Sequence, residues 1–231
     1  MKKIWLPAFA LVSLLNMMGV ALENKNLIYL TKPLLMPLLA FWLAMETRNQ
    51  PPRFLKKMVF AGLAFGTLGD ILLLNGDLPL FFMLGLIAFL FNHLSYIGGF
   101  SSVCNLDKGF LRQQPSWVLI FVLFPAGLLW WLWDGIPDPM KLPVGIYASV
   151  ITMMALSVVN LRGHVVLATY RMMMAGALLF MLSDSILAAG RFGSAIPASG
   201  IFIMATYIAG QFLIVKGVRD HLIHHPVHHH K

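Results

Sequence analysis

The most restrictive feature of this sequence is a succession of apolar runs, each long enough to cross a lipid bilayer as a helix. Hydrophobic residues make up 59% of the chain and charged residues only 11%, more apolar surface than a soluble domain of this size can bury. We therefore predict an all-α protein, a polytopic membrane helical bundle of eight transmembrane helices. The expected spans are Ile4–Leu22, Leu27–Met45, Met58–Leu74, Leu80–Phe100, Trp117–Trp133, Leu142–Val159, Val165–Ala189 and Ala198–Lys216.

The connections between the spans are short, and none has the composition of a separate soluble domain. The first run follows MKK, as in a signal peptide, but it lacks a clear small-residue cleavage site and ends in ALENKN. It is therefore interpreted as a helix. The prediction is one transmembrane domain over residues 1–220, followed by a His-rich cytoplasmic tail over residues 221–231.

The distribution of Lys and Arg predicts the orientation of the bundle. With the amino terminus in the cytoplasm, only Lys25, Lys141 and Arg191 fall in outer connections. The inner side collects Lys2, Lys3, Arg48, Arg53, Lys56, Lys57, Lys108, Arg112, Arg162, Lys216, Arg219 and Lys231. Both termini are therefore expected in the cytoplasm, and a bacterial inner membrane is the expected location. The net charge of +8 indicates contact with anionic membrane lipid, not with nucleic acid.

Two aspartates interrupt these apolar runs, Asp70 in the third span and Asp184 in the seventh. A carboxylate in hydrocarbon costs several kcal/mol unless it is paired, hydrated or protonated, so such residues usually face a bundle interior or a wet cavity. The two aspartates are candidate site residues. Pairing with Lys32 or Arg171 to fix helix packing is the structural alternative.

The surroundings of the two aspartates resemble each other. GTLGDILLLNGD and FMLSDSILAAGR both place an aspartate between small and apolar residues, and Asp70 lies 23 residues before His93 as Asp184 lies 23 before Tyr207. The pattern suggests a duplicated four-helix unit whose halves share one orientation, because four spans is an even number. Chance similarity between apolar helices remains the alternative.

Further polar residues lie within the spans. Lys32 is followed by Pro33 and Pro37, which are expected to kink the second span, and Lys32 alternatively extends to the membrane interface. The others occur as short stripes in the fourth and eighth spans, where hydrogen bonding between helices is the structural alternative. They are Asn92, His93, Tyr96, Tyr207 and Gln211. His93 is expected nearer the cytoplasm than Asp70, so a kinked or offset helix would be needed to join them.

Several of these segments, taken in order, resemble the YhhN-type lysoplasmalogenase family. They are KPLLMPLLA at 32–40, GTLGDILLL at 66–74, FNHLSYIGGF at 91–100, LLFMLSDSILAAGRF at 178–192 and YIAGQFLI at 207–214. The resemblance covers nearly the whole chain. It implies eight membrane helices and an ether hydrolase of lipid metabolism that cleaves the vinyl ether bond of lysoplasmalogens to a fatty aldehyde and a glycerophospho-alcohol.

Vinyl ether hydrolysis requires protonation of the alkenyl carbon and stabilisation of the resulting oxocarbenium ion. Two carboxyl groups in a secluded cleft supply an acid and an anion, as in glycoside hydrolysis. We therefore hypothesise that Asp70 and Asp184 converge in one chamber as the catalytic pair, without a metal or cofactor. Lys32 would hold the substrate phosphate, and Asn92, His93, Tyr96, Tyr207 and Gln211 would bind water or glycerol oxygens. The expected partner is a lysophospholipid that enters laterally from the membrane. The sequence is also compatible with a homo-oligomer.

Three other classes are compatible with parts of this pattern. A proton-coupled small-molecule or lipid transporter also uses duplicated halves with midplane carboxylates. A metal-dependent membrane hydrolase would need about three protein ligands, yet six of the eight histidines lie in the terminal HLIHHPVHHHK and no HExxH spacing occurs. A purely structural membrane protein explains the spans but gives the buried carboxylates no role.

Overall fold

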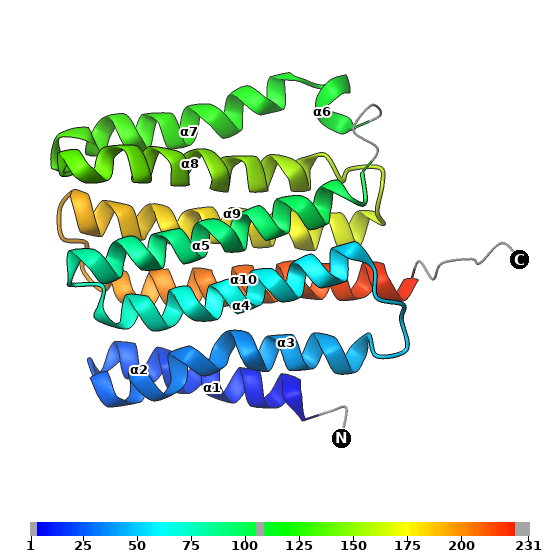
Figure 1. The fold of residues 1–231 in the computed structure, drawn as a ribbon, viewed down its shortest axis with the longest axis horizontal. Helices are drawn as coiled ribbons and strands as arrows, with labels where there is room; N and C mark the ends of the chain where they lie inside the picture. Colours follow the sequence, from blue (N-terminus) through cyan, green and yellow to red (C-terminus); the bar gives the residue numbers. More distant parts are fainter. Residues whose placement is uncertain (1–3, 105–108, 225–231) are drawn as a thin grey trace, which may run out of the picture.

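The structure is a computed structural model, and it describes residues 4–104 and 109–224 (Figure 1). Within these ranges the ordered elements are helical. They are α1 (Trp5–Ala21), α2 (Lys25–Thr31), η1 (Lys32–Leu34), α3 (Leu35–Glu46), α4 (Phe54–Leu72), η2 (Leu73–Asn75), α5 (Pro79–Ser101), α6 (Phe110–Gln113), α7 (Ser116–Leu132), η4 (Trp133–Gly135), α8 (Asp138–Val159), α9 (Leu167–Phe192) and α10 (Ser199–His224).

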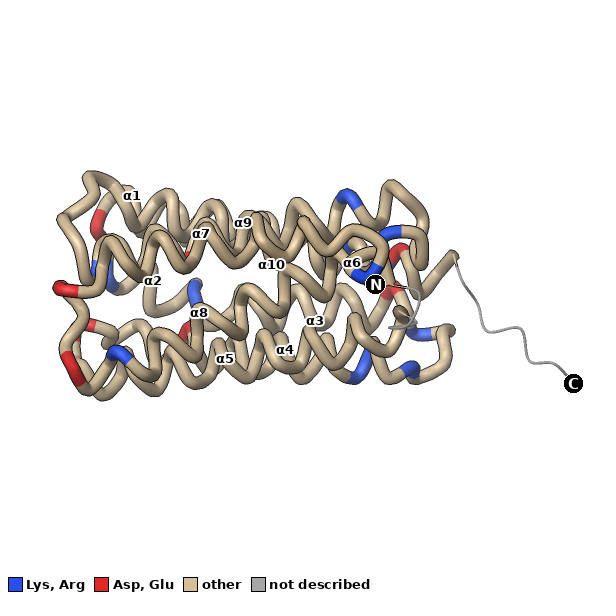
Figure 2. The backbone as a smooth tube through the Cα atoms, turned by 90° about the horizontal axis from the view of Figure 1, so that it is seen from above, with Lys and Arg blue, Asp and Glu red and all other residues tan. Residues whose placement is uncertain are grey.

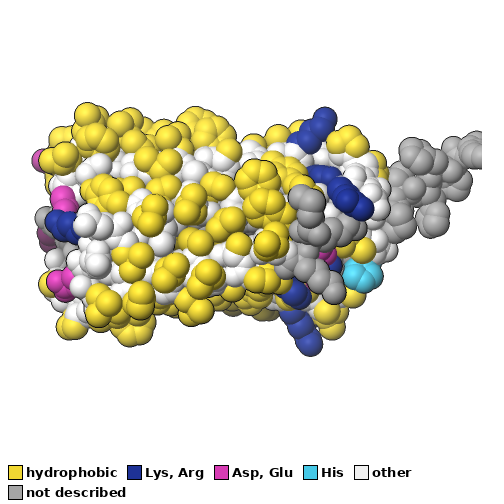
Figure 3. All heavy atoms as spheres, turned by 90° about the horizontal axis from the view of Figure 1, so that it is seen from below, with side chains coloured by type: hydrophobic (Ala, Val, Ile, Leu, Met, Phe, Trp, Pro, Cys, Tyr) yellow, Lys and Arg dark blue, Asp and Glu magenta, His cyan; other side chains and the backbone are white. Residues whose placement is uncertain are grey.

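The predicted all-helical membrane fold is confirmed. Seven helical segments are long and apolar enough to cross a membrane, and α1 adds a shorter apolar helix of 17 residues. Hydrophobic side chains cover the middle of the molecule, and charged side chains gather toward its ends (Figure 3). This is the surface of an integral, multi-pass membrane protein.

The last helix is longer than predicted. α10 runs to His224 and not to Lys216, and Leu222 is fully buried. Packing of this final turn therefore extends the bundle beyond the predicted boundary at residue 220. The remainder of the predicted tail, residues 225–231, lies outside the described residues.

The second span is interrupted where two prolines were expected to kink it. A 3-10 turn, Lys32–Leu34, separates α2 from α3, and Pro33 occupies its first turn. Proline lacks an amide hydrogen and cannot continue the α-helical hydrogen-bond ladder, which accounts for the change of helix type. As a result, Lys32 lies at the break and faces α4, against which this turn packs.

The two halves of the chain are arranged in opposite order across the bundle. In Figure 1, α1 and α7 lie at opposite edges, α3 and α8 lie next to them, and α4, α5, α9 and α10 form the centre. α4 packs along α5 and α9 packs along α10, while α5 contacts α8 and α10 contacts α3. The contacts of the first half thus correspond to those of the second half. A duplicated four-helix unit produces such an arrangement around a twofold axis.

The closest helix pair in the second half depends on small residues. A Cβ placed on Gly176 of α9 would lie 2.7 Å from the Gly210 carbonyl oxygen of α10, and a Cβ on Gly210 would lie 2.9 Å from the Gly176 oxygen. Glycine at both positions lets the two backbones touch, as is usual for close helix pairs in membranes. This contact fixes the depth of α10 against α9, and with it the depth of Tyr207 and Gln211.

The two ends of the bundle differ in charge. Figure 2 shows Lys and Arg gathered at the end where α1 begins and α10 finishes, and most Asp and Glu at the opposite end. We refer to these as the basic end and the acidic end. The positive-inside pattern predicts that the basic end faces the cytoplasm.

Candidate functional site

Asp70 lies in the last turn of α4 and is sealed from solvent, with 1% of its surface exposed. Its Oδ2 accepts a hydrogen bond of 2.8 Å from the Tyr207 hydroxyl of α10. Lys32, from the 3-10 turn, interacts with Asp70 electrostatically. We call Asp70, Lys32 and Tyr207 the Asp70 cluster. A cation and a hydroxyl donor together offset part of the cost of burying this carboxylate.

A second group of buried polar side chains extends from this cluster toward the basic end. The Tyr96 hydroxyl donates to Gln211 Oε1 at 2.6 Å, and Asn92 Nδ2 donates to the Gly62 carbonyl at 2.6 Å. Asn92 Oδ1 and Gln211 Nε2 have no protein partner, although both side chains are fully buried. Both amide groups border Gly66. Buried polar atoms normally have partners, so this pair of an acceptor and a donor marks a polar spot in the core.

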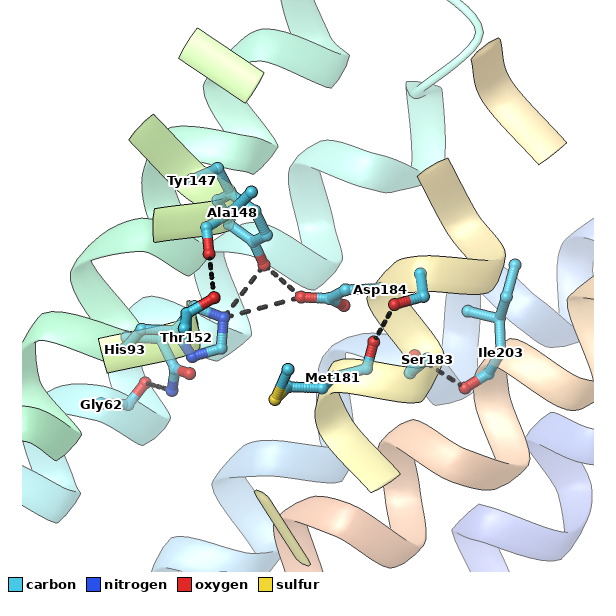
Figure 4. A network of polar contacts seen from close by, with 11 residues as sticks. Gly62, His93, Tyr147, Ala148, Thr152, Met181, Ser183, Asp184 and Ile203 are labelled. Carbon is cyan, nitrogen blue, oxygen red and sulfur yellow. Dashed lines mark hydrogen bonds and ion pairs between the residues drawn. The ribbon is translucent and has the colours of Figure 1, made fainter. Parts of the chain in front are cut away.

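Asp184 of α9 belongs to a different group (Figure 4). The Tyr147 hydroxyl of α8 donates to Asp184 Oδ2, and His93 Nε2 lies 3.0 Å from the same hydroxyl oxygen and 3.6 Å from Asp184 Oδ2. We call these three residues the Asp184 cluster. The His93 side chain is fully buried, whereas 16% of the Asp184 side chain is exposed. Asp184 is therefore the carboxylate that a ligand can reach.

The two clusters touch through aromatic rings. The Phe180 ring centroid lies 4.7 Å from that of His93 and 5.4 Å from that of Tyr207. Phe89 packs against the Tyr207 ring at 5.7 Å and against Phe180 at 6.3 Å. Among the described residues, no hydrogen bond or ion pair joins Asp70 to Asp184. The structure thus places the two carboxylates in adjacent clusters with separate partners, where we had expected one shared chamber.

The sequence-derived residues are distributed over both clusters in a crossed pattern. Asp70 of the first half bonds to Tyr207 of the second half, and Asp184 of the second half pairs with His93 of the first. These are the residues that share the spacing of 23 in the sequence. His93 and Tyr96, three residues apart on α5, belong to different hydrogen-bond networks. No kinked helix is needed to bring His93 to Asp70, because His93 approaches Asp184 instead.

Tyr147 is the site residue that the sequence analysis missed. It is buried in the middle of α8 and is the only described side chain that hydrogen-bonds both His93 and Asp184. The available signal was a hydroxyl-bearing aromatic inside the otherwise apolar run PVGIYASV. No spacing rule connects this residue with Asp184, 37 positions away.

Two narrow apolar pockets reach Asp184. One, of about 50 Å³, lies among η2, α5, α8 and α9 and is lined by residues that include Leu73, Phe89 and Tyr147. The other, of about 60 Å³, is bounded by α7 and includes Pro125, Leu129 and Ser185. Among the spanning helices that the structure describes, α7 is the least buried. This second pocket therefore places Asp184 close to the outer edge of the bundle.

The described residues contain no set of three or more His, Cys, Asp or Glu side chains placed for a metal ion. His164 lies at the basic end near Cys104, with the ring nitrogens 3.8 and 3.9 Å from the sulfur. Four of the terminal histidines, His225, His228, His229 and His230, lie outside the described residues.

Together these observations define a polytopic membrane protein with two ionisable sites inside its helical bundle. Such residues are rare within membranes and mark functional sites. The chain belongs to the YhhN family, which it matches over residues 27–218. No solved structure matches it.

Curated relatives carry the name lysoplasmalogenase. Human lysoplasmalogenase TMEM86B is 35% identical over 136 residues, covering 59% of this chain and 53% of the relative. Bovine lysoplasmalogenase TMEM86A is 30% identical over 160 residues, covering 68% of this chain and 62% of the relative. A lysoplasmalogenase of Mycobacterium tuberculosis is 29% identical over 137 residues, covering 59% and 50%. The matches thus span about half to three fifths of these relatives.

Proposed function

We propose that this protein is a membrane hydrolase that cleaves the vinyl ether bond of lysoplasmalogens. Family membership and the names of three relatives support an enzyme of this class over a transporter. The observation that carries the chemical assignment is Asp184, a partly accessible carboxylate that borders apolar pockets while Tyr147 and His93 hold it from the other side.

Asp184 is the general acid in this proposal. Its proton adds to the β-carbon of the alkenyl group, which opens the carbon–carbon double bond and leaves an oxocarbenium ion. Water adds to the α-carbon and returns a proton to Asp184, and the resulting hemiacetal releases the glycerol hydroxyl and the fatty aldehyde. The reaction consumes one water, regenerates the acid and draws on no cofactor.

Tyr147 and His93 position the acid. The Tyr147 hydroxyl donates to Oδ2 of Asp184, so the proton available for transfer resides on Oδ1. Because the tyrosine proton is directed to the carboxyl group, His93 Nε2 acts as donor to the tyrosine oxygen. This relay fixes the orientation of the carboxyl group without leaving a charge unpaired in the core.

Asp70 supplies the anion in this proposal. Lys32 interacts with it electrostatically, and the Tyr207 hydroxyl donates a hydrogen bond to one of its oxygens. Asp70 also lies one turn before Leu73, which lines a pocket shared with Asp184. From this position its negative charge would stabilise the developing cation and, through Tyr207, orient water.

The direct test is product analysis with purified protein in lipid nanodiscs. Lysoplasmenylethanolamine should yield equal amounts of fatty aldehyde and glycerophosphoethanolamine, while the saturated ether analogue should remain intact. Asp184→Asn should lower turnover by about 100-fold or more, because it removes the acid. Asp70→Asn should also lower turnover, because it removes the negative charge that stabilises the cation. Absence of aldehyde release by the wild-type protein would refute the proposed function. Full activity of either variant would refute the role proposed for the aspartate that it replaces.

A further inference from the structure

We propose that a polar pocket at the acidic end binds the phosphodiester headgroup of a zwitterionic lysolipid. The pocket has a volume of about 360 Å³ and lies between α2, the 3-10 turn η1 and the segment 73–78 that joins α4 to α5. The proposal rests on the proposed function in one respect, namely that the lipid chain continues toward Asp184.

The walls of this pocket are held by a hydrogen bond between distant segments. The Tyr29 hydroxyl of α2 donates to Asn75 Oδ1 at 2.8 Å and lies 3.2 Å from the Leu74 carbonyl oxygen. These contacts connect the start of the second span to the end of the third. The pocket therefore has a fixed rim without depending on a flexible loop.

The charges in the pocket match the two ends of a phosphoethanolamine or phosphocholine group. Lys25 and Lys32 are the cations, with Lys25 exposed at the mouth and Lys32 half-buried at the floor. Asp77, also exposed at the mouth, is the anion. Within the described residues, no ion pair within 4 Å occupies Lys25 or the Asp77 carboxylate. A phosphate between the lysines and an ammonium group beside Asp77 would satisfy all three charges.

The floor of the pocket leads to the reaction site. Lys32 interacts with Asp70, and Leu73 lines both this polar pocket and the apolar pocket at Asp184. Leu73 packs against Gly85, where an added Cβ would lie 2.7 Å from Leu73 Cδ2. A single-chain lipid with its phosphate at the lysines would cross Leu73 to place its first-position linkage toward Asp184. The pocket thus assigns the acidic end as the side of substrate entry.

The experiment measures binding, so that it does not depend on catalysis. A saturated alkyl-ether lysophosphoethanolamine and the alkylglycerol with the same chain are titrated onto nanodisc-embedded protein and quantified by native mass spectrometry. Lys25→Gln should weaken binding of the phosphoethanolamine ligand by about five-fold, since a partly exposed ion pair contributes up to about 1 kcal/mol. Binding of the alkylglycerol should be unchanged.

Two further variants make the test specific. Asp77→Asn should weaken binding of the phosphoethanolamine ligand. It should not change binding of the corresponding alkyl lysophosphate, which has no amine. Lys141→Gln is the matched control, because Lys141 lies at the same end of the bundle but pairs with Asp138 at 2.7 Å on α8. It should bind both ligands normally.

The outcomes separate this proposal from the proposed function. Equal affinity of Lys25→Gln and wild type for the phosphoethanolamine ligand, or equal weakening for both ligands, would overturn the headgroup pocket even if aldehyde is released. Selective loss of phosphoethanolamine binding would support the pocket even if the vinyl ether substrate is not cleaved.

Discussion

Asp184 and Asp70 have the same residue type and similar sequence surroundings, but their environments differ. The Asp70 side chain is closed off by Tyr207 and accompanied by Lys32, whereas Asp184 keeps contact with two apolar pockets. Environment determines whether a carboxyl group serves as an acid or as an anion. This difference is the basis for assigning the acid to Asp184.

Tyr147 provides a test of this assignment at a single atom. Tyr147→Phe removes the hydroxyl that donates to Asp184 and keeps the ring, so the variant should fold normally. Turnover should fall by about 10-fold, the usual value of one hydrogen bond between neutral groups. Ser149→Ala, on the same helix with an exposed hydroxyl bonded to its own helix backbone, is the control and should retain full turnover. Equal activity of both variants would remove Tyr147 from the site.

The sequence indicated most of the candidate site residues, but neither Tyr147 nor the division into two clusters. An ionisable side chain inside an apolar run is visible without a structure, which is why Asp70, Asp184, Lys32 and His93 were selected. Whether two such side chains face each other depends on helix rotation and on the rings packed between them. Phe89 and Phe180 keep the clusters apart, and as aromatic residues in membrane helices they carry no signal of that role.

Among the elements, the broken second span shows what local sequence can predict. Pro33 and Pro37 predicted a kink, and the structure has a 3-10 turn at Lys32–Leu34. The consequence for the site is that Lys32 lies at the break, where it interacts electrostatically with Asp70. A proline effect is local and therefore readable from the sequence, whereas the extension of α10 to His224 depends on packing against other helices.

The contact between α9 and α10 is the element on which both clusters depend. Gly176→Ala would place a Cβ within 2.8 Å of Ile214 and 2.7 Å of the Gly210 oxygen, so the helices must move apart. We expect a loss of about 1–3 kcal/mol in stability and a lower thermal midpoint in detergent. Gly145→Ala, on α8 with nothing within 4 Å of the added Cβ, should leave the midpoint unchanged. A Gly176→Ala protein as stable as wild type would contradict the described helix contact.

At the scale of the whole molecule, the duplicated arrangement explains the crossed partners. Each half contributes an aspartate on one helix and a ring-bearing partner 23 residues later, and each aspartate takes the partner from the other half. The Asp70 cluster is polar and contains a lysine, whereas the Asp184 cluster borders apolar pockets. This division suits a lipid with a charged head and a hydrocarbon chain.

The orientation of the bundle can be measured directly. In a Cys104→Ala background, Asp77→Cys should react with a membrane-impermeant maleimide applied to intact cells, and Arg162→Cys should react only after the membrane is opened. In a protein that keeps Cys104, this thiol should contribute little background labelling, because burial raises its pKa. Reaction of Arg162→Cys in intact cells would reverse the predicted topology.

The central claim is that Asp184 delivers a proton to the alkenyl carbon of a vinyl ether lipid. Its most direct test is turnover of lysoplasmenylethanolamine in D₂O, with the aldehyde reduced as it forms to prevent exchange. We predict one deuterium per product at the carbon next to the former aldehyde carbon. The total amount of labelled product should fall together with turnover in Asp184→Asn. Aldehyde without this deuterium, or undiminished labelling by Asp184→Asn, would contradict it.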